Sequence, residues 1–421
     1  MNAPRFNLIL TMGVALAVRL PAQEMIERLG ERLHFSLADG GLHGRISGSL
    51  EFEGYAISDP VADLVSGGKD KFFEPRFTLN VDAQLGPRGY FFAQGRIDRG
   101  FDVYYPEKET EARLDEYALR WELSEAGTGG LFVQAGKFAT VVGSWTKRHA
   151  AWENPFITAP LPYGDLVALW DANTSPSADV VLAWAHVRPV GNASDVLEDK
   201  ARRLPIIWGP AYGQGVAVAG RWGRVDFAGE IKSTGLSARP ERWTEGFGGV
   251  ERPTVSARVG WRPDPSWNLG FSASSGEFLA RVPMTRIPVG FTRHDYREVM
   301  IAHDLGFAWR HFQLWAEVFA VRFKVPGVGN LDTVSGYVEA KQRFTPRFSA
   351  AIRWNQQLFA HVTNAQGEAV RWGRQTWRLD LAPTWRFTTQ TQFKLQYSLR
   401  HEQPARERLT ELFSAQLNVR F

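Results

Sequence analysis

The chain of 421 residues carries 49 basic and 45 acidic side chains, a net charge of only +4, and no cysteine. This balance disfavours a nucleic-acid partner, which would need a basic stripe, and the lack of cysteine excludes disulfides and thiol chemistry. The sequence lacks a Walker loop, a dinucleotide-binding glycine fingerprint and an HExxH motif, and its nine histidines are scattered. We therefore expect no catalytic residues, no cofactor and no metal site.

The first 22 residues are predicted to be a secretory signal peptide. Arg5 precedes the apolar run Phe6–Val18, and small residues follow it. The run is shorter than the roughly 20 residues that a membrane-spanning helix needs. The alternative to a signal peptide is an ordinary buried helix at the amino terminus. Residues 23–41 are then expected to form a periplasmic amino-terminal segment.

Residues 42–421 alternate between apolar and polar side chains almost throughout. Within Arg76–Leu85, Phe77 and Leu79 share one face while charged and polar residues take the other, as in a half-buried strand. Some 400 residues of such a meander exceed a single β-sandwich, and no propeller repeat is visible. The pattern predicts an all-β fold, a transmembrane antiparallel β-barrel with a water-filled lumen, and the 16 tryptophans suit its aromatic girdles.

The connections alternate between short turns and longer loops, as in outer-membrane barrels, where the short turns face the periplasm. Short turns are predicted at Gly86–Gly89, Trp222–Arg224, Pro263–Ser266, Arg310–His311, Thr345–Arg347 and Thr388–Gln390. Strands near 131–138 and 177–187 would both run outward, which an antiparallel barrel does not allow for neighbours, so a strand at Tyr163–Ala172 is predicted between them. This pattern gives about 18 strands, with 16 as the alternative.

Several segments resemble the phosphate-selective porin family of bacterial outer membranes. They are GKF at Gly136–Phe138, DEYALRW at Asp115–Trp121, SGYVEAKQRFTPRFSAAIRW at Ser335–Trp354 and RLDLAPTWRFTTQTQFKLQYSLR at Arg378–Arg400. The final strand, Leu409–Phe421, is similar to the closing strands of outer-membrane barrels, whose assembly machinery reads a terminal Phe. The resemblance implies a porin in contact with outer-membrane lipid, assembled as a homotrimer. The dense Lys and Arg loop of a phosphate-selective channel is missing, so no substrate is implied.

The stretch Ala139–Pro162 is predicted to fold into the lumen as a constriction loop. In porins a loop after an early strand narrows the channel, and charged rings at a constriction set selectivity. The alternative is a surface loop outside the pore. The candidate pore-loop residues are Trp145, Lys147, Arg148, His149, Trp152 and Glu153.

Charged residues on the inward parity of the strands form the second candidate group. A charge facing lipid near midplane would cost about 2–4 kcal/mol, so these side chains should face the lumen. The candidates for the pore-lining wall are Arg45, Arg76, Arg96, Arg120, Arg258, Arg353, Arg378, Glu51, Asp82 and Glu116.

These features favour a porin for passive diffusion of small hydrophilic solutes, with a weak anion preference. One alternative is a sugar-specific channel in which Trp145, Trp152 and Tyr163 form a stacking surface. A second is an outer-membrane barrel enzyme, for which His294 beside Asp295 is the sole hint. A third is a non-conducting adhesin or scaffold.

Overall fold

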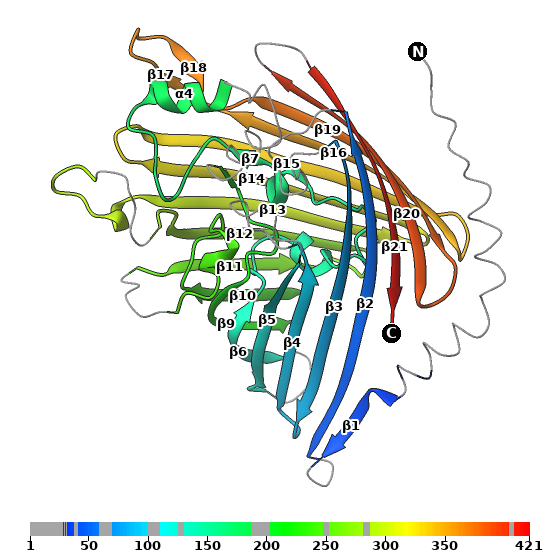
Figure 1. Ribbon diagram of the computed structural model, residues 1–421. Helices are drawn as coiled ribbons and strands as arrows, with labels where there is room; N and C mark the ends of the chain where they lie inside the picture. Colours follow the sequence, from blue (N-terminus) through cyan, green and yellow to red (C-terminus); the bar gives the residue numbers. More distant parts are fainter. Residues whose placement is uncertain are drawn as a thin grey trace, which may run out of the picture.

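The computed structural model describes residues 28, 30, 32–37, 41–58, 70–99, 110–124, 130–186, 203–246, 252–280, 287–403 and 408–421. Sixteen antiparallel strands close into one barrel, and a short additional strand lies at the seam (Figure 1). The barrel strands are β2 (Leu42–Ile57), β3 (Lys71–Leu85), β4 (Gly89–Asp98), β5 (Glu111–Glu122), β6 (Leu131–Phe138), β9 (Gly213–Trp222), β10 (Val225–Lys232), β11 (Thr254–Trp261), β12 (Trp267–Glu277), β13 (Arg297–Trp309), β14 (Phe312–Val325), β15 (Gly329–Arg343), β16 (Phe348–Phe359), β19 (Gln375–Arg386), β20 (Thr391–Gln403) and β21 (Arg408–Arg420). Each strand pairs with the next barrel strand along the chain, and β21 pairs with β2.

The prediction of 18 strands is wrong, and the alternative of 16 is confirmed. Residues 163–172 hold the end of helix α3 (Leu161–Gly164) and the two-residue strand β7 (Leu166–Val167), which pairs with β8 (Leu204–Pro205) outside the barrel sheet. The predicted strand at 177–187 is instead helix α4 (Ala178–His186). Its buried residues Val181, Leu182 and Ala185 have helical spacing.

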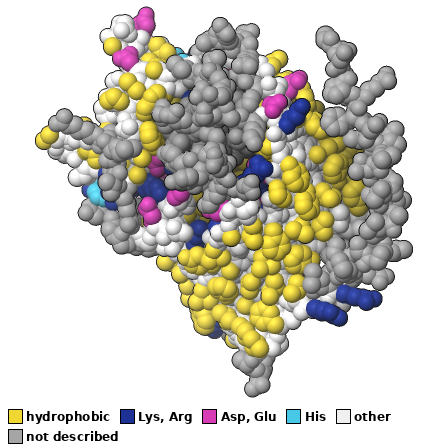
Figure 2. All heavy atoms as spheres, viewed as in Figure 1, with side chains coloured by type: hydrophobic (Ala, Val, Ile, Leu, Met, Phe, Trp, Pro, Cys, Tyr) yellow, Lys and Arg dark blue, Asp and Glu magenta, His cyan; other side chains and the backbone are white. Residues whose placement is uncertain are grey.

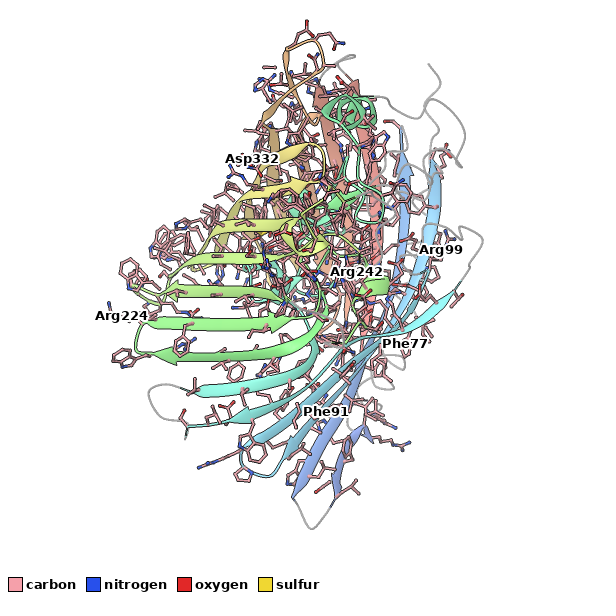
Figure 3. The ribbon with its side chains drawn as sticks, turned by 90° about the vertical axis from the view of Figure 1, so that its left-hand side faces the viewer. Phe77, Phe91, Arg99, Arg224, Arg242 and Asp332 are labelled. Carbon is pink, nitrogen blue, oxygen red and sulfur yellow. The ribbon has the colours of Figure 1, made fainter. Side chains whose placement is uncertain are left out.

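All predicted short turns join neighbouring strands at one end of the barrel, here called the turn end. The opposite end, the loop end, carries the longer connections. In Figure 3, Arg224 lies at the turn end of β9 and β10, and Arg242 lies beyond the other end of the same strands. One connection at the loop end, between β14 and β15, is as short as a turn, because β14 continues to Val325 and β15 begins at Gly329.

The remaining short elements lie at the loop end or within the connections. They are the 3-10 helices η2 (Trp145–Arg148), η3 (Pro240–Arg242) and η4 (Arg293–Asp295), and the hairpin of β17 (His361–Thr363) and β18 (Ala369–Arg371). Among the described residues, no helix is long and apolar enough to cross a membrane.

The outer surface of the barrel is apolar. On β11 and β16 the exposed positions carry Val255, Val259, Ile352 and Trp354, while their neighbours along each strand are buried. Figure 2 shows a broad hydrophobic surface over the strands. Exposed tryptophans gather at the turn ends of the strands, as in an aromatic girdle, and include Trp121, Trp222, Trp261, Trp267, Trp309 and Trp385. This exterior fits hydrocarbon.

The barrel closes at a seam where two segments share one edge of β2. The second half of β2, from Ser49 to Ile57, pairs with β21, and Ser49 lies opposite Arg420. The beginning of β2, from Leu42 to Arg45, pairs with β1 (His34–Leu37), and Leu37 lies opposite Leu42. β1 therefore occupies the same edge of β2 as β21, beyond the carboxyl-terminal end of β21. The predicted signal peptide and most of residues 23–33 lie outside the described residues.

The lumen is not uniformly wet. Toward the loop end of β13–β15, inward side chains such as Met300, Phe319 and Phe323 are apolar and buried. They pack against Val142 and Tyr163 of the long connection between β6 and β9. The described parts of this connection, residues 139–186 and 203–212, therefore contribute to an apolar cluster on one side of the barrel interior.

Candidate functional site

The first part of the long connection follows the inner wall of the barrel. Thr140 Oγ1 donates to Glu230 Oε1 on β10 (2.5 Å), and the Gly143 amide donates to Ser272 Oγ on β12 (3.3 Å). The loop thus crosses strands that follow it in sequence. This placement agrees with an inward-folded loop, and residues 139–165 are called the inner loop below.

Glu317 on β14 is the central attachment point of the inner loop. Its carboxylate accepts hydrogen bonds from the Ser144 amide, from Ser144 Oγ (2.7 Å), from the Trp145 amide (2.8 Å) and from Tyr163 Oη (2.6 Å). Glu317 did not stand out in the sequence. Its inward parity on β14 was the available signal, but parity does not reveal which inward acid receives a loop.

The second half of the inner loop is held by β16 and β19. Arg353 Nη2 donates to the Thr158 carbonyl (2.9 Å), and Arg378 Nη2 donates to the Ala159 carbonyl (2.5 Å). Both arginines also pair with Asp380 on β19. They face the interior as their parity predicts, but they hold the loop and do not border the open cavity.

Beside the inner loop lies a cavity of about 1090 Å³. Its far wall is formed by the inward side chains of β2, β3, β4 and β21, and its near wall by Trp145 and residues 149–154 and 156–159. Along β2 the lining extends from Arg45 to Tyr55, a stretch of about 33 Å of extended chain. This stretch is as long as the roughly 9–11 strand residues that cross a bilayer.

The charges that border this cavity are balanced. Its lining includes four arginines and four glutamates, namely Arg45, Arg76, Arg96, Arg420, Glu51, Glu53, Glu74 and Glu153. Several are already paired, because Arg76 binds Glu51 (3.0 Å) and Glu53 (3.1 Å), and Arg96 binds Asp115 (3.0 Å). In the described chain, the guanidinium of Arg45 makes no hydrogen bond or ion pair.

The pore-loop candidates do not supply a ring of positive charge. His149 lies between the Thr146 carbonyl (2.6 Å) and Tyr212 Oη (2.7 Å), and burial lowers its pKa to about 4, so it is neutral at pH 7. Arg148 binds Glu339 (2.6 Å), and Lys147 is exposed but borders no described cavity.

The tip of the inner loop does reach the open space. Trp152 borders the cavity and lies over the guanidinium of Arg420 (4.0 Å to the ring centre), and Glu153 is exposed beside it. Trp145 and Tyr163 also border the cavity, but Trp145 is 4% exposed and the two rings pack on each other with 4.5 Å between their centres. A continuous stacking surface for sugars is therefore not formed by these rings.

The other wall candidates lie outside the cavity lining. Arg258 is buried between Asp226 and Asp304, while Arg120 binds Gln134 and lies over a neighbouring aromatic ring. Asp82 accepts a hydrogen bond from the hydroxyl of Tyr90. Glu116 accepts a hydrogen bond from the Ala139 amide (3.1 Å), where the inner loop begins. Sequence parity placed these groups inward, but it did not separate paired charges from free ones.

The rim feature considered for an enzyme has a structural explanation. His294 Nδ1 hydrogen-bonds Glu277, while Asp295 accepts from the amide (2.8 Å) and hydroxyl (3.0 Å) of Thr292 as a helix cap. Asp295 therefore does not orient the histidine. Among the described residues, no group of three or more His, Cys, Asp or Glu could hold a metal ion.

No protein-family model matches the chain, and no curated protein matches its sequence. The fold, however, is found in solved outer-membrane channels. OmpF of Salmonella typhi, in complex with daunomycin, matches with a TM-score of 0.54 and 10% identity over 92% of this chain and 100% of that chain. The chain has the fold of bacterial porins.

Two further channels match as well. An anion-selective porin from Comamonas acidovorans gives a TM-score of 0.54 and 9% identity over 90% of this chain and 100% of its own. The outer-membrane channel DcaP of Acinetobacter baumannii gives a TM-score of 0.54 and 9% identity over 92% and 99%. These likenesses concern the fold, and membership of the phosphate-selective family remains a prediction.

Proposed function

We propose that this protein is a passive porin of a bacterial outer membrane, through which small hydrophilic solutes diffuse. The observation that carries the proposal is the cavity of about 1090 Å³ that follows β2 from Arg45 to Tyr55 beside the inner loop. Its lining carries four arginines and four glutamates beside aromatic side chains, whereas the barrel exterior is apolar. A wet passage inside a lipid-facing wall is the arrangement of a diffusion channel.

The inner loop is proposed to be the constriction. Trp152 and Glu153 face the strands β2, β3 and β21 across the cavity, so the narrow part is bounded by loop on one side and wall on the other. The pore-lining charges are then Arg45, Arg76, Arg96 and Glu51, together with charges from the loop tip and β21.

Reconstitution of the purified protein in a planar lipid bilayer tests the channel. We expect discrete conductance steps in potassium chloride. Intact, correctly folded barrels that insert and give no steps would contradict a porin and favour an adhesin or scaffold.

A weak anion preference is proposed as the selectivity. The charges of the cavity balance in number, but Arg45 lacks a partner in the described chain while most acids near it are paired. A reversal potential in a salt gradient should therefore show a small excess of chloride permeability. Arg45→Gln should reduce that excess, and Arg224→Gln, which removes an exposed charge at a turn, should not. If both variants reduced the excess chloride permeability equally, the anion preference would not originate from charges in the lumen.

Export and assembly are proposed from the sequence and its resemblance. The signal peptide should be absent from the mature protein, which sequencing of its amino terminus would show. A homotrimer in contact with outer-membrane lipid is expected, and light scattering of the detergent-solubilised protein measures its mass. A purely monomeric species that conducts fully would contradict the trimer without affecting the channel.

A further inference from the structure

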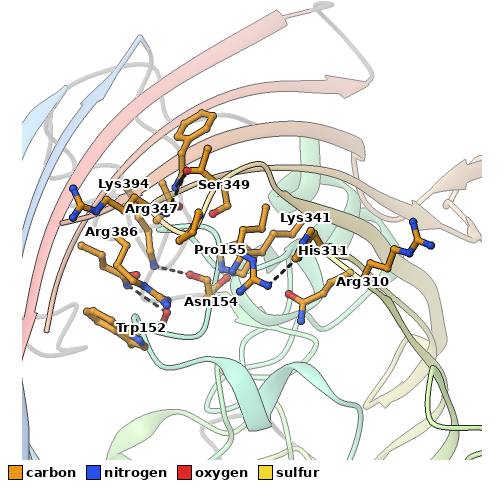
Figure 4. A pocket seen from close by; sticks show the side chains of 17 residues that line it. Trp152, Asn154, Pro155, Arg310, His311, Lys341, Arg347, Ser349, Arg386 and Lys394 are labelled. Carbon is orange, nitrogen blue, oxygen red and sulfur yellow. Dashed lines mark hydrogen bonds between the residues drawn. The ribbon is translucent and has the colours of Figure 1, made fainter. Parts of the chain in front are cut away.

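A second, smaller cavity lies on the other side of the inner loop, at the turn end of β14–β20. It encloses about 150 Å³, several times the roughly 30 Å³ that one water molecule occupies in the liquid. Trp152, Asn154 and Pro155 cover it, and the strand wall forms its floor (Figure 4).

The lining of this cavity carries positive charge without a carboxylate. Its cations are Arg310, Lys341, Arg343, Arg347, Arg386 and Lys394, and no Asp or Glu belongs to the lining among the described residues. The main cavity is different, since its acids equal its arginines in number. The basic cavity is thus a local feature and does not reflect the overall charge of the chain.

Neighbouring strands place the donors side by side in register. Arg343 on β15 lies opposite Ser349 on β16, Ser349 lies opposite Thr384 on β19, and Thr384 lies opposite Lys394 on β20. This row sets two hydroxyl groups between two cations. Lys341 is the next inward residue on β15.

Several of these donors are unused within the described protein. Lys341 Nζ and the guanidinium of Arg386 form no hydrogen bond or ion pair, and the hydroxyls of Ser349 and Thr384 form none either. The nearest inward acid on β15, Glu339, already binds Arg148 (2.6 Å). Converging donors without an acceptor are the arrangement that an anion would complete.

We propose that this cavity binds a small dianionic oxyanion such as sulfate. This inference rests on the proposed channel function and adds a discrete anion-binding site at the turn end of the channel. A tetrahedral dianion presents several acceptor oxygens in different directions, which matches the unused donors of β15, β16 and β19, whereas Lys394 on β20 adds positive charge while its Nζ donates to the Asn154 carbonyl (2.6 Å). A spherical ion with one negative charge, such as chloride, offsets less of the positive charge of the cavity and accepts hydrogen bonds from fewer of its donors.

Equilibrium dialysis of labelled sulfate against the folded full-length protein in detergent tests the site. We expect one saturable site per chain at low ionic strength, with chloride competing only at much higher concentration. Lys341→Gln should weaken sulfate binding at least tenfold, and Thr384→Val, which keeps the shape and removes the hydroxyl, several-fold. Arg224→Gln is the matched control, because it removes one exposed turn-end charge outside the lining and should leave affinity unchanged.

The result that overturns the site is non-saturable binding, or an equal loss of affinity in Arg224→Gln and Lys341→Gln. Unchanged heat-dependent migration on gels would show that each variant retains the folded barrel. We expect this for Lys341→Gln, because Lys341 Nζ has no hydrogen-bond or ion-pair partner among the described residues. Bilayer recording separates the two proposals. Saturable binding without conductance would reject the porin and support the site, whereas conductance without saturable binding would reject the site alone.

Discussion

Replacing Glu317 tests whether the inner loop is held in place by the wall. Glu317→Ala removes the acceptor of four hydrogen bonds, from the amide and hydroxyl of Ser144, the amide of Trp145 and the hydroxyl of Tyr163. Trp145 and Tyr163 are buried. Leaving a buried donor unsatisfied costs about 1–3 kcal/mol, so these two donors alone weaken loop docking by about 2–6 kcal/mol.

The assay is single-channel recording combined with limited proteolysis of the protein in liposomes. Glu317→Ala should give fluctuating conductance and new cleavage within 139–165, while the thermal unfolding of the barrel wall changes little. Glu317→Gln, which keeps an acceptor oxygen and the side-chain volume, should show a smaller effect. A Glu317→Ala protein with steady currents and wild-type protease resistance would refute the idea that this carboxylate fixes the loop.

Three further predictions concern the same loop. Trp152→Ala should raise single-channel conductance because it removes a bulky ring from the cavity, whereas Trp222→Ala on the lipid-facing surface should not. Gly143→Ala should destabilise loop docking by about 1–2 kcal/mol, seen as faster proteolysis, because φ there is +74° and the new Cβ would lie 2.5 Å from Tyr163 Oη. His149 has a pKa lowered to about 4 from 6.5, so loop docking should weaken as pH falls from 6.5 to 4, and His149→Gln should remove that part of the pH dependence of proteolysis.

The barrel wall was predictable because its signal is local. Alternate side chains of a strand point to opposite faces, so the pattern in a segment such as β11 identifies the lipid face without knowledge of its neighbours. Glycine, proline and polar residues marked the tight turns in the same way. The error lay in residues 163–187, where a rule on strand direction was applied to a segment that contains helices and a short separate sheet.

The sequence by itself therefore determined a lipid-facing barrel, its tight turns and the inward parity of its charges. The tertiary structure decided that 16 strands close the wall, where the inner loop lies and which inward charges remain unpaired. The reason is distance along the chain, since Ser144 meets Glu317 across 173 positions and Asn154 meets Lys394 across 240. Periodicity within a strand carries no information about such contacts, and they determine how the lumen is divided.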